Sequence, residues 1–205
     1  MNFEAVILNV SLLWLLTTAH EFAHAWAATR LGDDTPRYEG RLTLHPMAHV
    51  DWLGTVILPA LTSLLGGGFL GWGKPVNTNV ARLRGGLRGL ALVALAGPAA
   101  NVVFAVILGA VAMFTAHVIP PLAEYAGHGV RLSLYLAIFN MLPVPPLDGS
   151  KLLLAARVPA VIYNELARFG FLLLIVAISV SDLGYWLSRW SFAGSQQIFS
   201  FFQIG

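Results

Sequence analysis

The chain alternates between long apolar runs and short polar intervals. Five runs stand out, at about 5–29, 52–73, 89–117, 131–147 and 159–181. An α-helix rises about 1.5 Å per residue, so about 20 apolar residues cross the hydrocarbon layer of a bilayer. Most of the runs approach or exceed that length. The pattern therefore predicts an all-α polytopic membrane protein that resides in a lipid bilayer.

Two of the runs contain residues that interrupt helices. The second holds Pro59 and the triplet Gly66-Gly67-Gly68, and the fourth runs into Pro143-Val144-Pro145-Pro146, where proline removes helical hydrogen bonds. If all five runs crossed the membrane, the basic residues between runs one and three would divide between both faces, although positive charge collects on the cytoplasmic side. These residues are Arg30, Arg37, Arg41, Lys74, Arg82, Arg84 and Arg88.

We therefore expect run 52–73 to form a re-entrant or interfacial hairpin, which leaves about four transmembrane helices. All seven basic residues then lie on the cytoplasmic side with Lys151 and Arg157, and loop 118–130, which has no Lys or Arg, lies outside. Non-helical backbone at membrane depth is tolerated only beside protein or a watery cavity. The interrupted runs thus indicate a hydrated site that opens towards the cytoplasm.

A small membrane-associated β-element is expected between the first two runs. Residues 35–44 alternate partly between apolar and polar side chains around a central Glu39-Gly40, a pattern that is typical of a short hairpin. The segment Gly71-Trp72-Gly73-Lys74-Pro75-Val76 can add another strand. An exposed strand edge can pair with an extended peptide. An ordered loop without a substrate role is an equal alternative.

Composition supports membrane residence and excludes several function classes. The chain has 205 residues, of which 57% are hydrophobic and 11% charged, whereas soluble domains carry about 25% charged residues. The net charge of +2 comes from residues in short loops, so nucleic acid is not expected as a partner. Cysteine is absent, which excludes disulfides and thiolate metal sites.

The domain organisation follows from the same pattern. The first run lacks a basic start, since the chain opens Met1-Asn2-Phe3-Glu4, so we expect a retained span rather than a cleaved signal peptide. No polar interval is long enough for a separate soluble domain. Residues 1–205 are therefore expected to form one membrane domain, with a core at 5–158 and a C-terminal helix and aromatic interfacial tail at 159–205.

The first run contains the motif His20-Glu21-Phe22-Ala23-His24. These two histidines and Glu21 are the only ionisable side chains between residues 5 and 29, and a charge at the centre of a span costs about 3 kcal/mol. Residues four apart share one helix face, so His20 and His24 can bind one cation while Glu21 reaches water beside it. Zn²⁺ suits such ligands. The alternative is a pair of histidines that merely packs between helices.

Two histidines leave zinc under-coordinated, because catalytic sites usually supply three protein ligands. Asp148 is the candidate for the third, since it directly follows the fourth run and is the only carboxylate between Glu124 and Glu165. It can equally be an N-cap for a helix that starts near Ser150. His45 and His49 share the i,i+4 spacing, but Pro46 interrupts a continuous helix there. We interpret them as interfacial polar residues.

Two separated motifs carry a family resemblance. HEFAH in the first run and Asn140-Met141-Leu142-Pro143-Val144-Pro145-Pro146-Leu147-Asp148-Gly149 resemble the two signatures of the site-2 protease family of intramembrane zinc metalloproteases. Ala96-Gly97-Pro98-Ala99-Ala100-Asn101 resembles the third motif of that family, and GWGKPV resembles a segment of its compact bacterial members. The match covers most of residues 15–150 in the expected order and is weak beyond about 158.

The resemblance implies one Zn²⁺ per chain, with Asp148 as the third ligand and Glu21 as the catalytic carboxylate. It implies a membrane-anchored protein substrate that is cut within or near its own span, in a bacterial or archaeal cell membrane, with the active site towards the cytoplasm. Asn140 would hold the substrate carbonyl or the oxyanion, although it can equally satisfy the broken helix. Asn101 is a second candidate for that work.

We do not expect the PDZ or CBS domains of larger relatives in these 205 residues. The alternative function is a non-proteolytic metal-binding membrane protein. The intact Glu21 argues against that alternative, because zinc binding alone does not require a carboxylate at this position.

Overall fold

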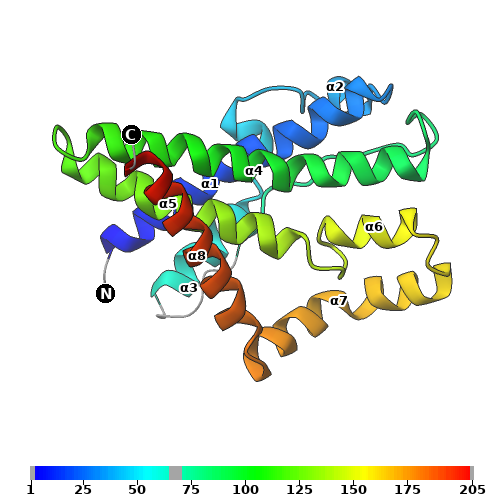
Figure 1. Cartoon of the computed structure of the whole chain (residues 1–205). Helices are drawn as coiled ribbons and strands as arrows, with labels where there is room; N and C mark the ends of the chain where they lie inside the picture. The colour runs from blue at the N-terminus through cyan, green and yellow to red at the C-terminus, as the bar shows by residue number, and fades with distance from the viewer. Residues whose placement is uncertain (1–2, 65–70, 204–205) are drawn as a thin grey trace.

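The computed structural model describes residues 3–64 and 71–203, and within these ranges every regular element is helical. Three long helices, α1 (Phe3–Arg30), α4 (Leu87–Thr115) and α5 (Pro120–Asn140), form the central bundle (Figure 1). The remaining elements are α2 (Thr35–Tyr38), η1 (Pro46–His49), η2 (Trp52–Ile57), α3 (Leu58–Leu64), α6 (Gly149–Ala155), α7 (Ala160–Val180) and α8 (Leu183–Gln203).

Small residues let the helices of the bundle approach one another. A Cβ on Gly129 of α5 would lie 2.7 Å from Leu108 Cδ1 of α4 and 3.1 Å from Leu12 Cδ2 of α1. In lipid, such close packing stabilises helix association, because apolar surface gains little from leaving one apolar environment for another. The surrounding core contains Leu13, Leu16, Ala105, Leu108, Ala112, Ala126, Val130, Leu134 and Leu136.

Helix α8 packs across α5 and α4 (Figure 1), so it is more than a surface tail. Leu187, Ser191 and Ser195 recur every four residues along it and are all buried. A Cβ on Gly109 of α4 would lie 2.4 Å from Ile198 Cγ2. Its other face is the expected aromatic surface, with Trp190 and Phe192 each more than half exposed.

Three helices in the described residues are long and apolar enough to cross a membrane: Val6–Arg30 of α1, α4 and α7. The expected count of about four stays a prediction. The span expected at 131–147 has different limits, because α5 begins at Pro120 and ends at Asn140, before the proline cluster. It carries Glu124, His128 and Arg131, and it is not among the three candidate spans.

The run expected as a hairpin does return on itself. Trp72 N donates to Gly54 O at 3.0 Å, and Thr55 Oγ1 donates to Trp72 O at 2.8 Å. These bonds bring the two ends of run 52–73 together, with η2 and the short α3 following the first end. That the run does not cross the membrane stays a prediction. Gly66, Gly67 and Gly68, which contributed to this expectation, lie outside the described residues.

The expected β-hairpin at 35–44 is wrong, since Thr35–Tyr38 is a helical turn and no strand occurs in residues 3–64 and 71–203. Asp33 accepts hydrogen bonds from Thr35 N at 3.1 Å and Thr35 Oγ1 at 2.6 Å, which starts a turn with Pro36 in its first positions. Burial by itself would raise the pKa of Asp33, but these bonds and one from Asn79 N outweigh it and lower that pKa. Local capping thus overrides the alternation.

Candidate metal centre

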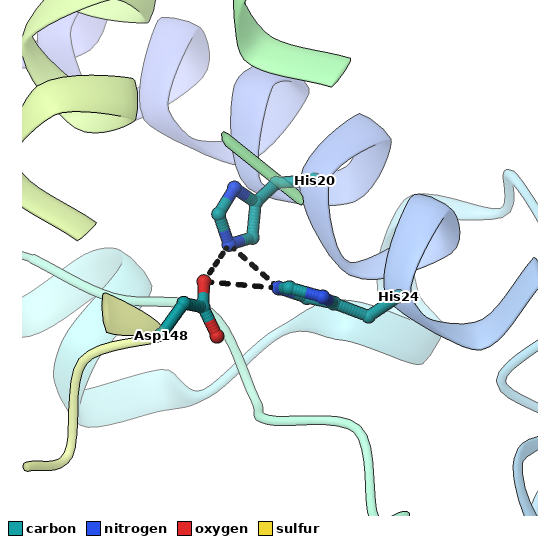
Figure 2. A group of neighbouring side chains, drawn as sticks. All are labelled: His20, His24 and Asp148. Carbon is teal, nitrogen blue, oxygen red and sulfur yellow. Dashed lines mark hydrogen bonds and ion pairs between the residues drawn. The ribbon is translucent and has the colours of Figure 1, made fainter. Parts of the chain in front are cut away.

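Helix α1 and the start of α6 bring three potential metal ligands together. His20 Nε2, His24 Nε2 and Asp148 Oδ2 form a triangle with all three sides at 3.0 Å (Figure 2). All three residues are buried, with at most 6% of their surface exposed. In the described part of the chain, this is the one group of three or more such side chains close enough to share a metal ion.

The hydrogen bonding of His24 shows that this triangle suits a cation. His24 Nδ1 lies 2.7 Å from Val93 O, and since a carbonyl only accepts, Nδ1 carries the proton and Nε2 keeps its lone pair. That lone pair faces the Asp148 oxygen at 3.0 Å. Two acceptors at this distance repel unless a proton or a metal ion lies between them. Imidazole and carboxylate donors are those of catalytic zinc sites, so the residues fit Zn²⁺.

Asp148 serves as a metal candidate rather than as a helix cap. It stands at the N-cap position of α6, yet its side chain makes no capping hydrogen bond. One oxygen faces the histidines, and the other accepts a 2.8 Å bond from Lys151 Nζ. The chain passes close to Met141 where α6 begins. Gly149 makes this approach possible, because a Cβ there would lie 2.2 Å from Met141 O.

Helix α4 forms the wall behind the histidines, and Gly97 allows it to approach them. A Cβ on Gly97 would lie 2.3 Å from His24 Nε2 and 2.6 Å from His20 Nε2. No side chain other than hydrogen fits there without moving the candidate ligand atoms. The Ala96–Asn101 motif was identified from the family resemblance alone. The structure gives it a steric role, because Gly97 leaves room for the two imidazole rings.

Glu21 lies beside the triangle and outside it. Its Oε2 accepts a 3.1 Å hydrogen bond from Val76 N, in the extended segment that follows the hairpin. Glu21 lines a cavity of about 1040 Å³ together with His20, His24 and Asp148. The cavity continues between α5, α7 and α8, so it is large enough for several residues of a peptide.

The other candidates have different positions. Asn140 lines the cavity, but its Nδ2 donates to Leu136 O at 2.9 Å within its own helix. Asn101 also lines the cavity, but it lies behind His20, with Nδ2 3.2 Å from His20 Nδ1. His45 is exposed, whereas His49 is buried and bonds Thr43 O at 2.8 Å. Neither joins the metal candidates.

Sequence reasoning missed Lys151 and Arg41. In the sequence, Lys151 was interpreted only as a basic residue on the cytoplasmic side. Its i,i+3 spacing from Asp148 could have indicated that the two side chains pair. Arg41 is buried and donates through Nη2 to Lys74 O, while Lys74 N donates to His49 O at 2.9 Å. Burial lowers the pKa of Arg41. These contacts hold the extended segment that carries Val76 against Glu21.

Comparison with known proteins identifies the family. The sequence profile of peptidase family M50 matches residues 8–130. The protein named "Putative zinc metalloprotease YwhC" of Bacillus subtilis strain 168 is 34% identical over 177 residues, which cover 82% of this chain and 77% of that protein. "Putative zinc metalloprotease Rip2" of Mycolicibacterium smegmatis is 33% identical over 198 residues, or 91% of this chain and 72% of that protein. No solved structure matches significantly.

The chain therefore belongs to peptidase family M50, and it is a membrane zinc metalloendopeptidase. This confirms the family that the motifs indicated. The profile match ends before Asp148, so the contact of this residue with the two histidines is a finding of the structure alone.

Gly97→Ala is expected to displace His20 and His24 and to lower zinc occupancy and activity together, because the new methyl group would overlap both rings. Zinc content of the purified protein measures the effect. Gly127→Ala is the matched control, since its Cβ would meet only Phe199 Cζ at 3.8 Å in ordinary contact and alanine favours a helix. Full zinc occupancy in Gly97→Ala would show that α4 does not limit the site.

Proposed function

We propose that this chain is an intramembrane endopeptidase that hydrolyses peptide bonds within or near the transmembrane segments of membrane-anchored proteins. The observation that carries the proposal is the triangle of His20, His24 and Asp148 beside Glu21, inside a cavity between apolar helices. A water-consuming reaction at membrane depth needs such an enclosed polar site.

His20, His24 and Asp148 would hold the zinc ion. When bound, Zn²⁺ supplies a Lewis acid that polarises the scissile carbonyl and makes water more acidic. Glu21 accepts a proton from the attacking water and passes it to the departing amine. The bond from Val76 N keeps the Glu21 carboxylate directed away from the ligand triangle. Asn140, in the cavity wall, would orient the substrate carbonyl.

A transmembrane substrate must unwind before it is cut, because a helix hides its peptide groups in internal hydrogen bonds. The segment from Gly71 to Val76 runs along the cavity without forming a strand with another part of the described chain. An unwound substrate can pair with its backbone, as peptides do with sheet edges. Helix-breaking residues in the substrate should therefore speed cleavage.

The site would open towards the cytoplasm of a bacterial or archaeal cell. The end of α1, the turn α2, the first turn of α4 and the junction of α6 with α7 lie at one end of the molecule (Figure 1). Arg30, Arg37, Arg88 and Arg157 belong to these segments, and Arg41, Arg82 and Arg84 belong to the loops next to them. Arg84 N donates to Leu31 O at 2.8 Å between two of these parts. Positive charge at one end favours its placement in the cytoplasm.

Glu21→Gln is expected to lower cleavage of a membrane-anchored reporter by about a hundredfold or more while zinc remains bound, because Glu21 moves protons and does not bind the metal. The measurement pairs zinc content with cleavage in detergent or vesicles. Glu165→Gln, a change at an exposed position on α7, is the control. Cleavage at the normal rate by Glu21→Gln would contradict the mechanism, and absence of cleavage by the unaltered chain would favour the non-proteolytic alternative.

Asp148→Ala is expected to lower both zinc affinity and activity, since it removes one of three ligands. Asp51→Ala separates this effect from the loss of a cap, because Asp51 does cap η2 by accepting a 2.8 Å bond from Gly54 N. Loss of a cap costs about 1 kcal/mol of stability and leaves zinc bound. Normal zinc affinity in Asp148→Ala would remove it from the ligand set.

Single cysteines test the topology, because the chain has none of its own. Met47→Cys and Ala81→Cys lie at exposed positions on either side of the hairpin, and Ala116→Cys lies at the exposed far end of α4. An impermeant maleimide should label the first two only in inverted vesicles and the third only in intact cells. Labelling of positions 47 and 81 from opposite sides would show that run 52–73 crosses.

A further inference from the structure

Asn101 of α4 stands directly behind one of the candidate zinc ligands. It is 1% exposed, and its side-chain amide nitrogen lies 3.2 Å from His20 Nδ1, the ring atom on the far side from Asp148. Its other amide atom, Oδ1, is buried and has no hydrogen-bond partner in the described part of the chain. A buried polar atom without a partner costs about 1–3 kcal/mol. This cost applies in either orientation of the amide, so the contact with His20 decides which orientation is favoured.

The orientation of the amide determines which nitrogen of His20 carries the proton. With Nδ2 facing His20, the ring must accept at Nδ1 and carry its proton on Nε2, which is the atom that faces His24 and Asp148. A protonated Nε2 cannot bind a metal. Rotation of the amide by about 180° exchanges oxygen and nitrogen without changing its shape. Oδ1 then accepts from Nδ1–H, and Nε2 is left with a lone pair.

We propose that Asn101 is a positioning residue for the zinc site: its Oδ1 accepts a hydrogen bond from His20 Nδ1–H and so presents His20 Nε2 to the metal. Zinc binding and this amide orientation stabilise each other. Val93 O does the same for His24, whose Nδ1 lies 2.7 Å away. One helix, α4, therefore sets the tautomer of both histidines, one through a side chain and one through its backbone.

This role differs from contact with a substrate, because His20 lies between Asn101 and the ligand triangle. Partners of this kind keep ligand rings oriented and typically change metal affinity by about 10- to 100-fold when they are removed. The inference rests on the proposed ligation of zinc by His20, and the experiment separates the two.

The test measures zinc affinity by competition with a chromophoric chelator. Asn101→Leu keeps the approximate size of the side chain but offers no acceptor, and zinc affinity should fall about 10- to 100-fold. Asn101→Asp restores an acceptor and should bind zinc within a few fold of the unaltered chain. Ser133→Ala is the matched control, since it removes a buried 2.7 Å bond to the backbone oxygen of the same Asn101 without touching its amide.

Unchanged zinc affinity in Asn101→Leu, or an equal loss in Asn101→Asp and Asn101→Leu, would overturn the inference. An equal loss in Ser133→Ala would also overturn it, because the effect would then come from packing. His20→Ala serves as the reference: if it binds zinc normally, the proposed ligand set is wrong, which is a different failure from that of Asn101.

A measurement on the unaltered chain covers the case in which the Asn101 variants fail to fold. In ¹⁵N-histidine-labelled protein, the two histidines whose signals shift on zinc addition should both be protonated at Nδ1 and bound through Nε2. A zinc-shifted histidine bound through Nδ1 would overturn the inference.

Discussion

The two histidines of α1 and the carboxylate of Asp148 lie so close together that a proton or a metal ion must lie among them. With its proton on Nδ1, His24 presents a lone pair to a carboxylate oxygen at 3.0 Å. In a buried site this pair is favourable only with a proton or a metal ion between its two acceptors. A zinc ion bound there would link α1 to the start of α6 across more than 120 residues of chain, and the packing of the other helices brings these two elements together.

Three features of the backbone make the contact possible. Gly97 lets α4 lie against both imidazole rings, and Gly149 lets the chain turn tightly beneath Met141 before α6 begins. The end of α5 at Asn140 redirects the chain towards the histidines. Each position is one where a larger or a helix-continuing residue would separate the ligands, so local chain geometry and metal chemistry depend on each other.

Charged side chains next to the triangle position two carboxylates, those of Asp148 and Glu21. Lys151 binds the second oxygen of Asp148, which leaves the first oxygen directed at the histidines. Arg41 and His49 make hydrogen bonds to the backbone of Lys74. Two residues later, Val76 N donates to the Glu21 carboxylate. The proposed catalytic carboxylate is thus positioned by a segment that also borders the cavity, so occupation of that segment by a peptide can affect Glu21 directly.

Periodicity and chemical type were enough to predict the helical membrane class and the pairing of His20 with His24. These depend on neighbours in sequence, whose relative positions helix geometry sets. The sequence could only suggest Asp148 and misjudged residues 35–44, where the side chain of Asp33 outweighed a weak alternation. Tertiary structure decided that Asp148 faces the histidines instead of capping α6, and that Asn101 contacts His20. Those outcomes depend on which helices approach one another. Packing at residues such as Gly97 and Gly129 decides that, and the spacing within a motif does not reveal it.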